Sequence, residues 1–246
     1  MKRILKALIV PVVLVCSFSN LKAQTADDII QKHFAAIGGV DNWKKINTMK
    51  TTASMTANGM EIPLIITVQQ NKAMRMELTI NGMTGYSIIT DKTGWNYMPF
   101  GGQTKPEVVP DEQVKQMQDG LDLQGPLVDY KTKGNKITYL GKDDVEGTDC
   151  YKLKVVYTSG MEETMYFDAT NYYHIRSVQK VTANGKEESI TKNFSNYQKT
   201  PEGILYPMSI DMGMGAMNVK SVEINKPIDA SIFKPTEMSG SKETKK

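Results

Sequence analysis

Side chains able to do acid–base or nucleophilic chemistry are few and scattered. The only histidines are His33 and His174, and Cys150 is the only cysteine beyond the first 23 residues. His33 lies on an apolar helical face, which is typical of a packed core histidine. The sequence contains no G-x-S-x-G, H-E-x-x-H, C-x-x-C, P-loop or G-x-G-x-x-G motif. We therefore expect neither an enzyme, nor a metal site, nor a cofactor.

The pattern of charged residues also indicates structural rather than catalytic roles. The acidic pairs Asp143-Asp144 and Glu162-Glu163 fall at turns or strand starts, as solvated surface residues do. Arg75 and Arg176 are the only arginines after the first 23 residues, and each fits the polar face of a strand. The alternative is that one of them anchors a helical insertion or a ligand head group.

Methionine is the unusual component, with 16 residues. Many occupy the apolar phase of a strand, which suits either an ordinary β core or a surface that repacks around varied apolar ligands. Because methionine specifies core packing poorly, the set favours an adaptable hydrophobic cavity. We expect the cavity to be lined by Met60, Ile62, Leu64, Ile66, Met74, Met76, Leu78, Trp95, Tyr97, Met165, Phe167, Tyr206, Met208, Ile210 and Met212.

The elements that must position these residues centre on a run of strands from Met60 to Phe100. Apolar residues occupy the even positions of 60–68 and 74–80, which places them on one face of each strand. Asn81-Gly82 is the preferred pair for a tight hairpin. A second series of strands begins at Lys136, and its segment 204–214 repeats the even apolar phase.

Two helical regions interrupt the strands. Thr25 is a suitable N-cap for a helix whose apolar face runs from Ile29 to Ile37. A helical insertion begins near Pro110, and we expect its apolar side chains to form a lid: Val114, Met117, Leu121 and Leu127. The predicted fold is mainly β with short α helices. It is a half-open, strongly curved antiparallel β-barrel of about 11 strands, covered by the N-terminal helix and the lid.

The first 23 residues read as a secretory signal peptide, with a basic start, an apolar run from Ala7 to Val15 and a small residue, Ala23, before the cut. Lipid anchoring through Cys16 is disfavoured, because bacterial lipidation requires a small residue where Val15 stands. We expect export to the periplasm, one β domain over 24–238 and a disordered polar tail over 239–246. After cleavage 26 basic and 27 acidic residues remain, so the net charge of +3 becomes −1. This balance argues against nucleic-acid binding. We expect a monomer.

Six segments resemble a known family in order and spacing. They are KAMRMEL (72–78), SIITDKTGWNYMP (87–99), GTDCYKLKV (147–155), MYFDATNYYHIRSV (165–178), NYQKTPEGILYPMSI (196–210) and IDASIFKP (228–235). Together they are similar to the outer-membrane lipoprotein-sorting proteins of the LolA/LolB-like superfamily.

The resemblance implies a barrel lidded by short helices that carries the acyl chains of lipoproteins. Its partners would be lipidated proteins or lipids, and inner- and outer-membrane sorting components. Well-studied carriers latch the lid with an arginine just before the strand that here contains Arg75. This chain has Gln69, Gln70, Asn71 and Lys72 in that region, so Arg75 does not inherit that role. The alternative function is a non-transporting envelope interaction or lipid-sensing module of the same fold.

Overall fold

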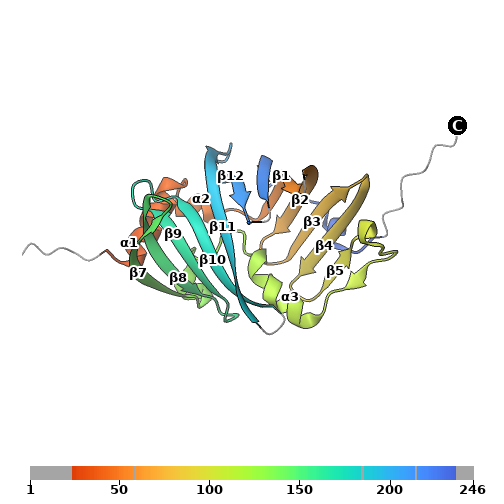
Figure 1. Cartoon of the computed structure of the whole chain (residues 1–246), viewed down its shortest axis with the longest axis horizontal. Helices are drawn as coiled ribbons and strands as arrows, with labels where there is room; N and C mark the ends of the chain where they lie inside the picture. The colour runs from red at the N-terminus through yellow and green to blue at the C-terminus, as the bar shows by residue number, and fades with distance from the viewer. Residues whose placement is uncertain (1–23, 58, 184–185, 214, 237–246) are drawn as a thin grey trace, which may run out of the picture.

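The computed structural model describes residues 24–57, 59–183, 186–213 and 215–236. In this part of the chain, one curved antiparallel sheet of thirteen strands carries short helices on its concave side (Figure 1). The predicted half-open, mainly β architecture is confirmed, with thirteen strands rather than about eleven. The predicted signal peptide, Cys16 and the tail over 239–246 lie outside the described residues.

The strands follow the alternating segments of the sequence. They are β1 Thr48–Ala57, β2 Met60–Gln69, β3 Ala73–Ile80, β4 Met83–Thr90, β5 Gly94–Tyr97, β6 Glu107–Val108, β7 Lys136–Val145, β8 Thr148–Val156, β9 Glu162–Asp168, β10 His174–Ala183, β11 Lys186–Lys199, β12 Leu205–Asp211 and β13 Ala216–Ile224. The helices are α1 Ala26–Ala36, α2 Val40–Lys44, α3 Asp111–Met117 and α4 Tyr130–Lys133, with 3₁₀ helices η1 Pro99–Gly101, η2 Gln118–Leu121 and η3 Ala230–Phe233.

The order of strands across the sheet is β6-β5-β4-β3-β2-β1-β13-β12-β11-β10-β9-β8-β7. Every neighbouring pair is antiparallel, and the first strand pairs with the last, Met49 opposite Ile224. The series of strands therefore begins and ends in the middle of the sheet. Strands β6 and β7 follow one another in the chain but form opposite edges of the sheet, so residues 109–135 must connect one edge to the other.

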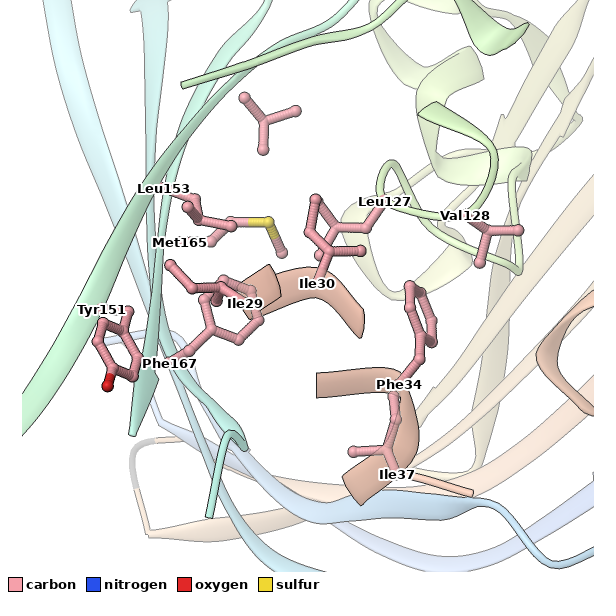
Figure 2. Close-up of a cluster of buried hydrophobic side chains, with 11 residues drawn as sticks. Ile29, Ile30, Phe34, Ile37, Leu127, Val128, Tyr151, Leu153, Met165 and Phe167 are labelled. Atoms are coloured by element: carbon pink, nitrogen blue, oxygen red, sulfur yellow. The ribbon is translucent and has the colours of Figure 1, made fainter. Parts of the chain in front are cut away.

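Helix α1 fills the concave side of strands β8 and β9. The Thr25 side chain caps it and forms a reciprocal capping box with Asp28. Ile29, Phe34 and their neighbours meet strand side chains such as Leu153 and Phe167 in one buried cluster (Figure 2). This end of the sheet is a closed core.

The convex side of strands β3 to β5 is covered by the C-terminal segment, residues 228–236. Arg75 donates a hydrogen bond to the carbonyl oxygen of Ile232 at 2.9 Å and lies over the ring of Tyr86, 4.1 Å from its centroid. The Tyr86 hydroxyl donates to the carbonyl oxygen of Thr236, and Phe233 is buried in the same cluster. Arg75, which was expected on a polar face, is thus buried and anchors the C-terminal segment.

His33 belongs to the α1 core. It is 7 % exposed, its Nδ1–H donates to the carbonyl oxygen of Tyr172 at 2.8 Å, and its ring meets the Phe167 ring edge-on. Burial lowers the pKa of His33 to about 3. In the unfolded chain the His33 imidazole takes up a proton near pH 6.5, whereas in the folded chain it stays neutral down to about pH 3. The contribution of the neutral, buried His33 to the free energy of unfolding is therefore complete above pH 6.5 and is lost as the pH falls toward 3.

We expect the substitution His33→Asn to flatten this acid sensitivity, because asparagine keeps a hydrogen-bond donor and does not titrate. From pH 7.5 to pH 5, the free energy of unfolding of the wild type should fall by about 2 kcal/mol more than that of the variant. Urea unfolding followed by circular dichroism at both pH values measures this. Parallel pH profiles would contradict the assignment.

Candidate functional site: an open apolar face between two covered ends

The middle of the concave side carries a patch of apolar side chains that we call the central apolar face. Strands β1, β2, β3, β12 and β13 contribute to it. Its members are Ala53, Leu64, Ile66, Met76, Leu78, Tyr206, Met208, Ile210, Met217, Val219 and Val222. Ala53, Leu64, Met217 and Val219 are buried, whereas the other seven are only half-buried. These seven side chains therefore leave part of their surface uncovered by the rest of the protein.

Strand register explains why these residues share a face. Ile66 pairs with Met76 and Leu64 with Leu78, so the even positions of β2 and β3 point the same way. Ile210 of β12 pairs with Met217 of β13, and β13 continues the face to β1. The face carries no charge. Tyr206 is the one member with a polar atom, and burial raises the pKa of its hydroxyl.

Both flanks of the central apolar face are covered. On the β3–β4 flank, Val114 and Leu121 from α3 and η2 pack on Ile89, and Met74 packs against this group. On the opposite flank, α1 covers β8 and β9. Between these two covered flanks, the middle of the concave side keeps half-buried apolar side chains, and we call this open stretch of the concave side the trough.

Seven of the fifteen predicted lining residues gather here. Leu64, Ile66, Met76, Leu78, Tyr206, Met208 and Ile210 belong to the central apolar face. Ile62 is buried on the same phase of β2, and Met74 lies under the lid. The remaining predicted residues lie elsewhere.

Met165 and Phe167 are buried beneath α1 and are not accessible from the trough. Met60 is 49 % exposed at the start of β2, and Met212 follows β12 in a turn. They lie at the end of the face and do not line its centre.

Trp95 and Tyr97 were predicted to line the cavity, but the structure places them on the convex side. Trp95 pairs with Ile88, and Ile88 pairs with Arg75, so all three point away from the central apolar face. Trp95 and Tyr97 instead belong to the cluster that holds Phe233 of the C-terminal segment. Sequence reasoning assumed a single apolar face, whereas these strands are covered on both faces.

The four predicted lid residues also lie in different surroundings. Val114 and Leu121 face the sheet as expected, being 2 % and 3 % exposed. Leu127 is buried against α1 rather than over the central apolar face. Met117 is 38 % exposed. Within the predicted insertion, α3 and η2 are therefore the elements that pack on the sheet as a lid.

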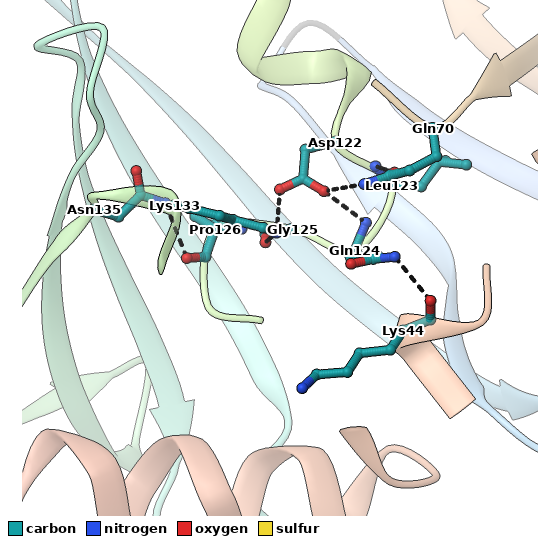
Figure 3. Close-up of polar contacts among 9 residues, drawn as sticks. All are labelled: Lys44, Gln70, Asp122, Leu123, Gln124, Gly125, Pro126, Lys133 and Asn135. Atoms are coloured by element: carbon teal, nitrogen blue, oxygen red, sulfur yellow. Dashed lines mark hydrogen bonds and ion pairs between the residues drawn. The ribbon is translucent and has the colours of Figure 1, made fainter. Parts of the chain in front are cut away.

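A polar network holds the lid where it leaves η2 (Figure 3). Gln70 of the β2–β3 turn donates to Asp122 at 2.7 Å and accepts from the Leu123 N–H at 2.6 Å. Lys133 of α4 binds both the Asp122 carboxylate and the Gly125 carbonyl oxygen. The Asn71 N–H also donates to the Leu121 carbonyl oxygen. The segment in which the resemblance implies an arginine latch thus contacts the lid through Gln70 and Asn71.

The structure also contains a cleft that was not foreseen from the sequence. A cleft of about 960 Å³ lies between α1, α2 and residues 127–132, with Ile30, Phe34 and Leu127 among its lining residues. Ion pairs cross its rim, Lys44 with Asp129 at 2.8 Å and Lys131 with Asp27 at 3.0 Å. No motif indicates it, because the helices meet only in the tertiary structure.

Burial shifts the pKa values of two side chains that could do chemistry. Burial lowers the pKa of His174 to about 4 and raises the pKa of the Cys150 thiol to about 11. Among the described residues, no group of three or more His, Cys, Asp or Glu side chains is arranged to hold a metal ion.

We expect Asp122→Ala to loosen the lid, because it leaves Lys133 without its carboxylate partner in a site where both side chains are mostly buried (24 % and 18 % exposed). The free energy of unfolding should fall by about 2 kcal/mol, and amide exchange should accelerate in residues 111–125. Urea unfolding and hydrogen exchange measure these effects. The control is Asp143→Ala, which removes the more exposed pair with Lys152 and should change little. Equal effects of the two substitutions would contradict a latch.

Comparison with known proteins gives the fold its context. No protein-family model matches the sequence, and none of the curated proteins matches it. Solved structures do match. A LolA superfamily protein from Nitrosomonas europaea aligns with a TM-score of 0.55 at 11 % identity, covering 86 % of this chain and 98 % of that one.

Two further solved structures align with this chain to a similar degree. A domain from Vibrio parahaemolyticus, described as an outer membrane lipoprotein-sorting protein domain, aligns with a TM-score of 0.53 at 12 % identity and covers 84 % of this chain and 94 % of that one. A DUF1329 family protein from Desulfovibrio piger aligns with a TM-score of 0.55 at 11 % identity, covering 86 % and 98 %. The chain thus has the fold seen in LolA superfamily and lipoprotein-sorting structures.

Proposed function

We propose that this protein binds the acyl chains of lipidated proteins or other lipids on its central apolar face, without catalysis. The observation that carries the proposal is the set of seven half-buried apolar side chains in an open trough between two covered ends. Each CH₂ group buried there contributes about 0.8 kcal/mol. A ligand with several methylene groups along the trough therefore gains enough free energy to bind.

Methionine suits such a ligand. Met76 and Met208 come from strands on opposite sides of β1 and β13, so an acyl chain between them would touch both. Their unbranched, flexible side chains adapt to chains of different length and branching.

The biological setting in this proposal is the periplasm, with lipoprotein sorting to the outer membrane as the process served. It is supported by the signal-like first 23 residues and by the fold shared with lipoprotein-sorting structures. In the part of the chain that the structure describes, no helix is long and apolar enough to span a membrane. Sorting components of the two membranes would be the partners, and the protein would act as a monomer.

The test is the substitution of Met76 or Met208 by aspartate. Both side chains are half-buried at an open surface, so each variant should fold, with a circular dichroism spectrum like that of the wild type. A carboxylate on the face must lose its hydration when an acyl chain covers it, so affinity should fall by roughly tenfold or more. Titration with a fluorescent fatty acid, together with native mass spectrometry of the purified protein, measures binding.

The matched control is Leu140→Asp, which changes a 47 % exposed residue of edge strand β7 outside the trough. This variant should bind the probe as the wild type does. If the wild type takes up no probe, or if both aspartate variants bind it normally, the central apolar face is not the ligand site. Unfolding of both variants would instead indicate a tightly packed core, as in the alternative of a non-transporting module.

A further inference from the structure

Three methionines place their thioether side chains on the open middle of the concave side. Met76 and Met208 are half-buried members of the central apolar face. Met55 of β1 is also half-buried, and it lies directly opposite Ile62 and Met217 on the two neighbouring strands. Directly opposed residues of antiparallel strands point to the same side of the sheet, so Met55 also faces the trough. We call Met55, Met76 and Met208 the trough methionines.

Access to solvent separates the trough methionines from two other groups. The buried methionines are packed inside apolar clusters: Met49, Met165 and Met217. The exposed methionines lie outside the centre of the trough: Met60, Met83 and Met117. The trough methionines are intermediate, because protein covers part of each side chain and the rest faces the open trough. A small polar molecule dissolved in water can therefore reach them as long as no ligand covers the face.

The thioether is the group on this face that a peroxide can modify. Its sulfur donates an electron pair to one oxygen atom of hydrogen peroxide, so that an S–O bond forms and the O–O bond breaks. The proton on the transferred oxygen passes to the departing hydroxide, which leaves as water. The sulfur is thereby oxidised by two electrons to methionine sulfoxide, and the peroxide is reduced. Cys150 is a poor competitor, because its thiol is buried and its pKa is raised to about 11.

A sulfoxide changes the polarity of the trough more than its shape. Its oxygen atom is a polar hydrogen-bond acceptor on a side chain that was apolar. The one hydroxyl group of the central apolar face, on Tyr206, already shares a hydrogen bond with the Thr51 side chain. Water can solvate the sulfoxide oxygen while the trough is empty. An acyl chain would remove that water without offering a donor, which makes binding less favourable.

We propose that the trough methionines are oxidation sites for peroxides, and that their sulfoxides switch off the binding of apolar ligands. The inference rests on the proposed function, because it assigns a regulation to the same face. Oxidation empties the trough without unfolding the domain, since the buried methionines of the packed clusters are out of reach. A bound acyl chain covers the trough methionines, so ligand and oxidant compete for the same surface.

The experiment treats the full chain with hydrogen peroxide, with and without a saturating fatty acid, and locates sulfoxides by mass spectrometry of peptides. A fluorescent fatty acid is titrated before treatment and after removal of the peroxide. The trough variant replaces all three trough methionines by leucine (Met55→Leu, Met76→Leu, Met208→Leu). The matched control replaces the three exposed ones (Met60→Leu, Met83→Leu, Met117→Leu). Leucine keeps the volume and forms no sulfoxide. Each protein is compared with its own untreated sample, so differences in starting affinity cancel.

We expect sulfoxide to form first at the exposed methionines, then at the trough methionines, and not at the buried methionines while the domain is folded. Oxidised wild type and oxidised control should bind the probe roughly tenfold more weakly than their untreated samples, whereas the trough variant should keep its own affinity within about twofold. Bound fatty acid should protect the trough methionines and leave Met83 and Met117 reactive. The circular dichroism spectrum should not change.

The switch is overturned if the trough methionines stay unmodified in the folded chain, or if the trough variant loses affinity on oxidation as the wild type does. Loss of the circular dichroism signal on oxidation also overturns it, because unfolding would then be what stops binding. An oxidised wild type that binds the probe as before contradicts the switch and leaves the proposed function standing. An untreated wild type that takes up no probe contradicts the proposed function itself and removes the switch with it.

Discussion

The connection between the two edges of the sheet is the constraint on which the rest of this structure depends. Strands β6 and β7 are neighbours in the chain and opposite edges in space, because the sheet is built outward from the β1–β13 pair. Residues 109–135 must therefore run from one edge to the other, and in the structure their apolar side chains pack on the concave side at both ends. A segment that crosses an apolar surface has its own apolar residues buried by it, as Val114 and Leu121 are. The connection thus covers the two flanks of the trough and leaves the central apolar face open.

That crossing is fixed at its two ends and held by polar contacts in between. Val114 and Leu121 fix one end on β4, and Leu127 and Val128 fix the other against α1. Between them, Asp122 joins Gln70 to Lys133, in a region that contributes little apolar burial. Such a connection is easier to open than a packed core, since a few hydrogen bonds hold it. The central apolar face beside it keeps its half-buried side chains, and the combination suits reversible binding of an apolar chain.

Much of the fold and part of the site could be predicted from local patterns. The Thr25 cap, the even-numbered apolar phase of β2, β3 and β12, and the insertion at Pro110 all appear as expected. The strand count was too low. The two-residue strand β6 is too short to show alternation, and pairing with β5 defines it. Trp95 and Tyr97 were assigned to the wrong side, because an aromatic strand residue does not reveal whether the sheet is covered on one face or on both.

The sequence by itself determined the local features: strands with one apolar phase, their turns, the capped first helix, the helical insertion and the abundance of methionine. Periodicity and turn chemistry act over a few residues, so they can be read directly. Only the tertiary structure decided that β1 pairs with β13, that Arg75 holds the C-terminal segment, and that α1 fills one end of the trough. These contacts join residues more than a hundred positions apart. Their free energies depend on packing partners that no local pattern specifies, and that packing determines which apolar residues remain available to a ligand.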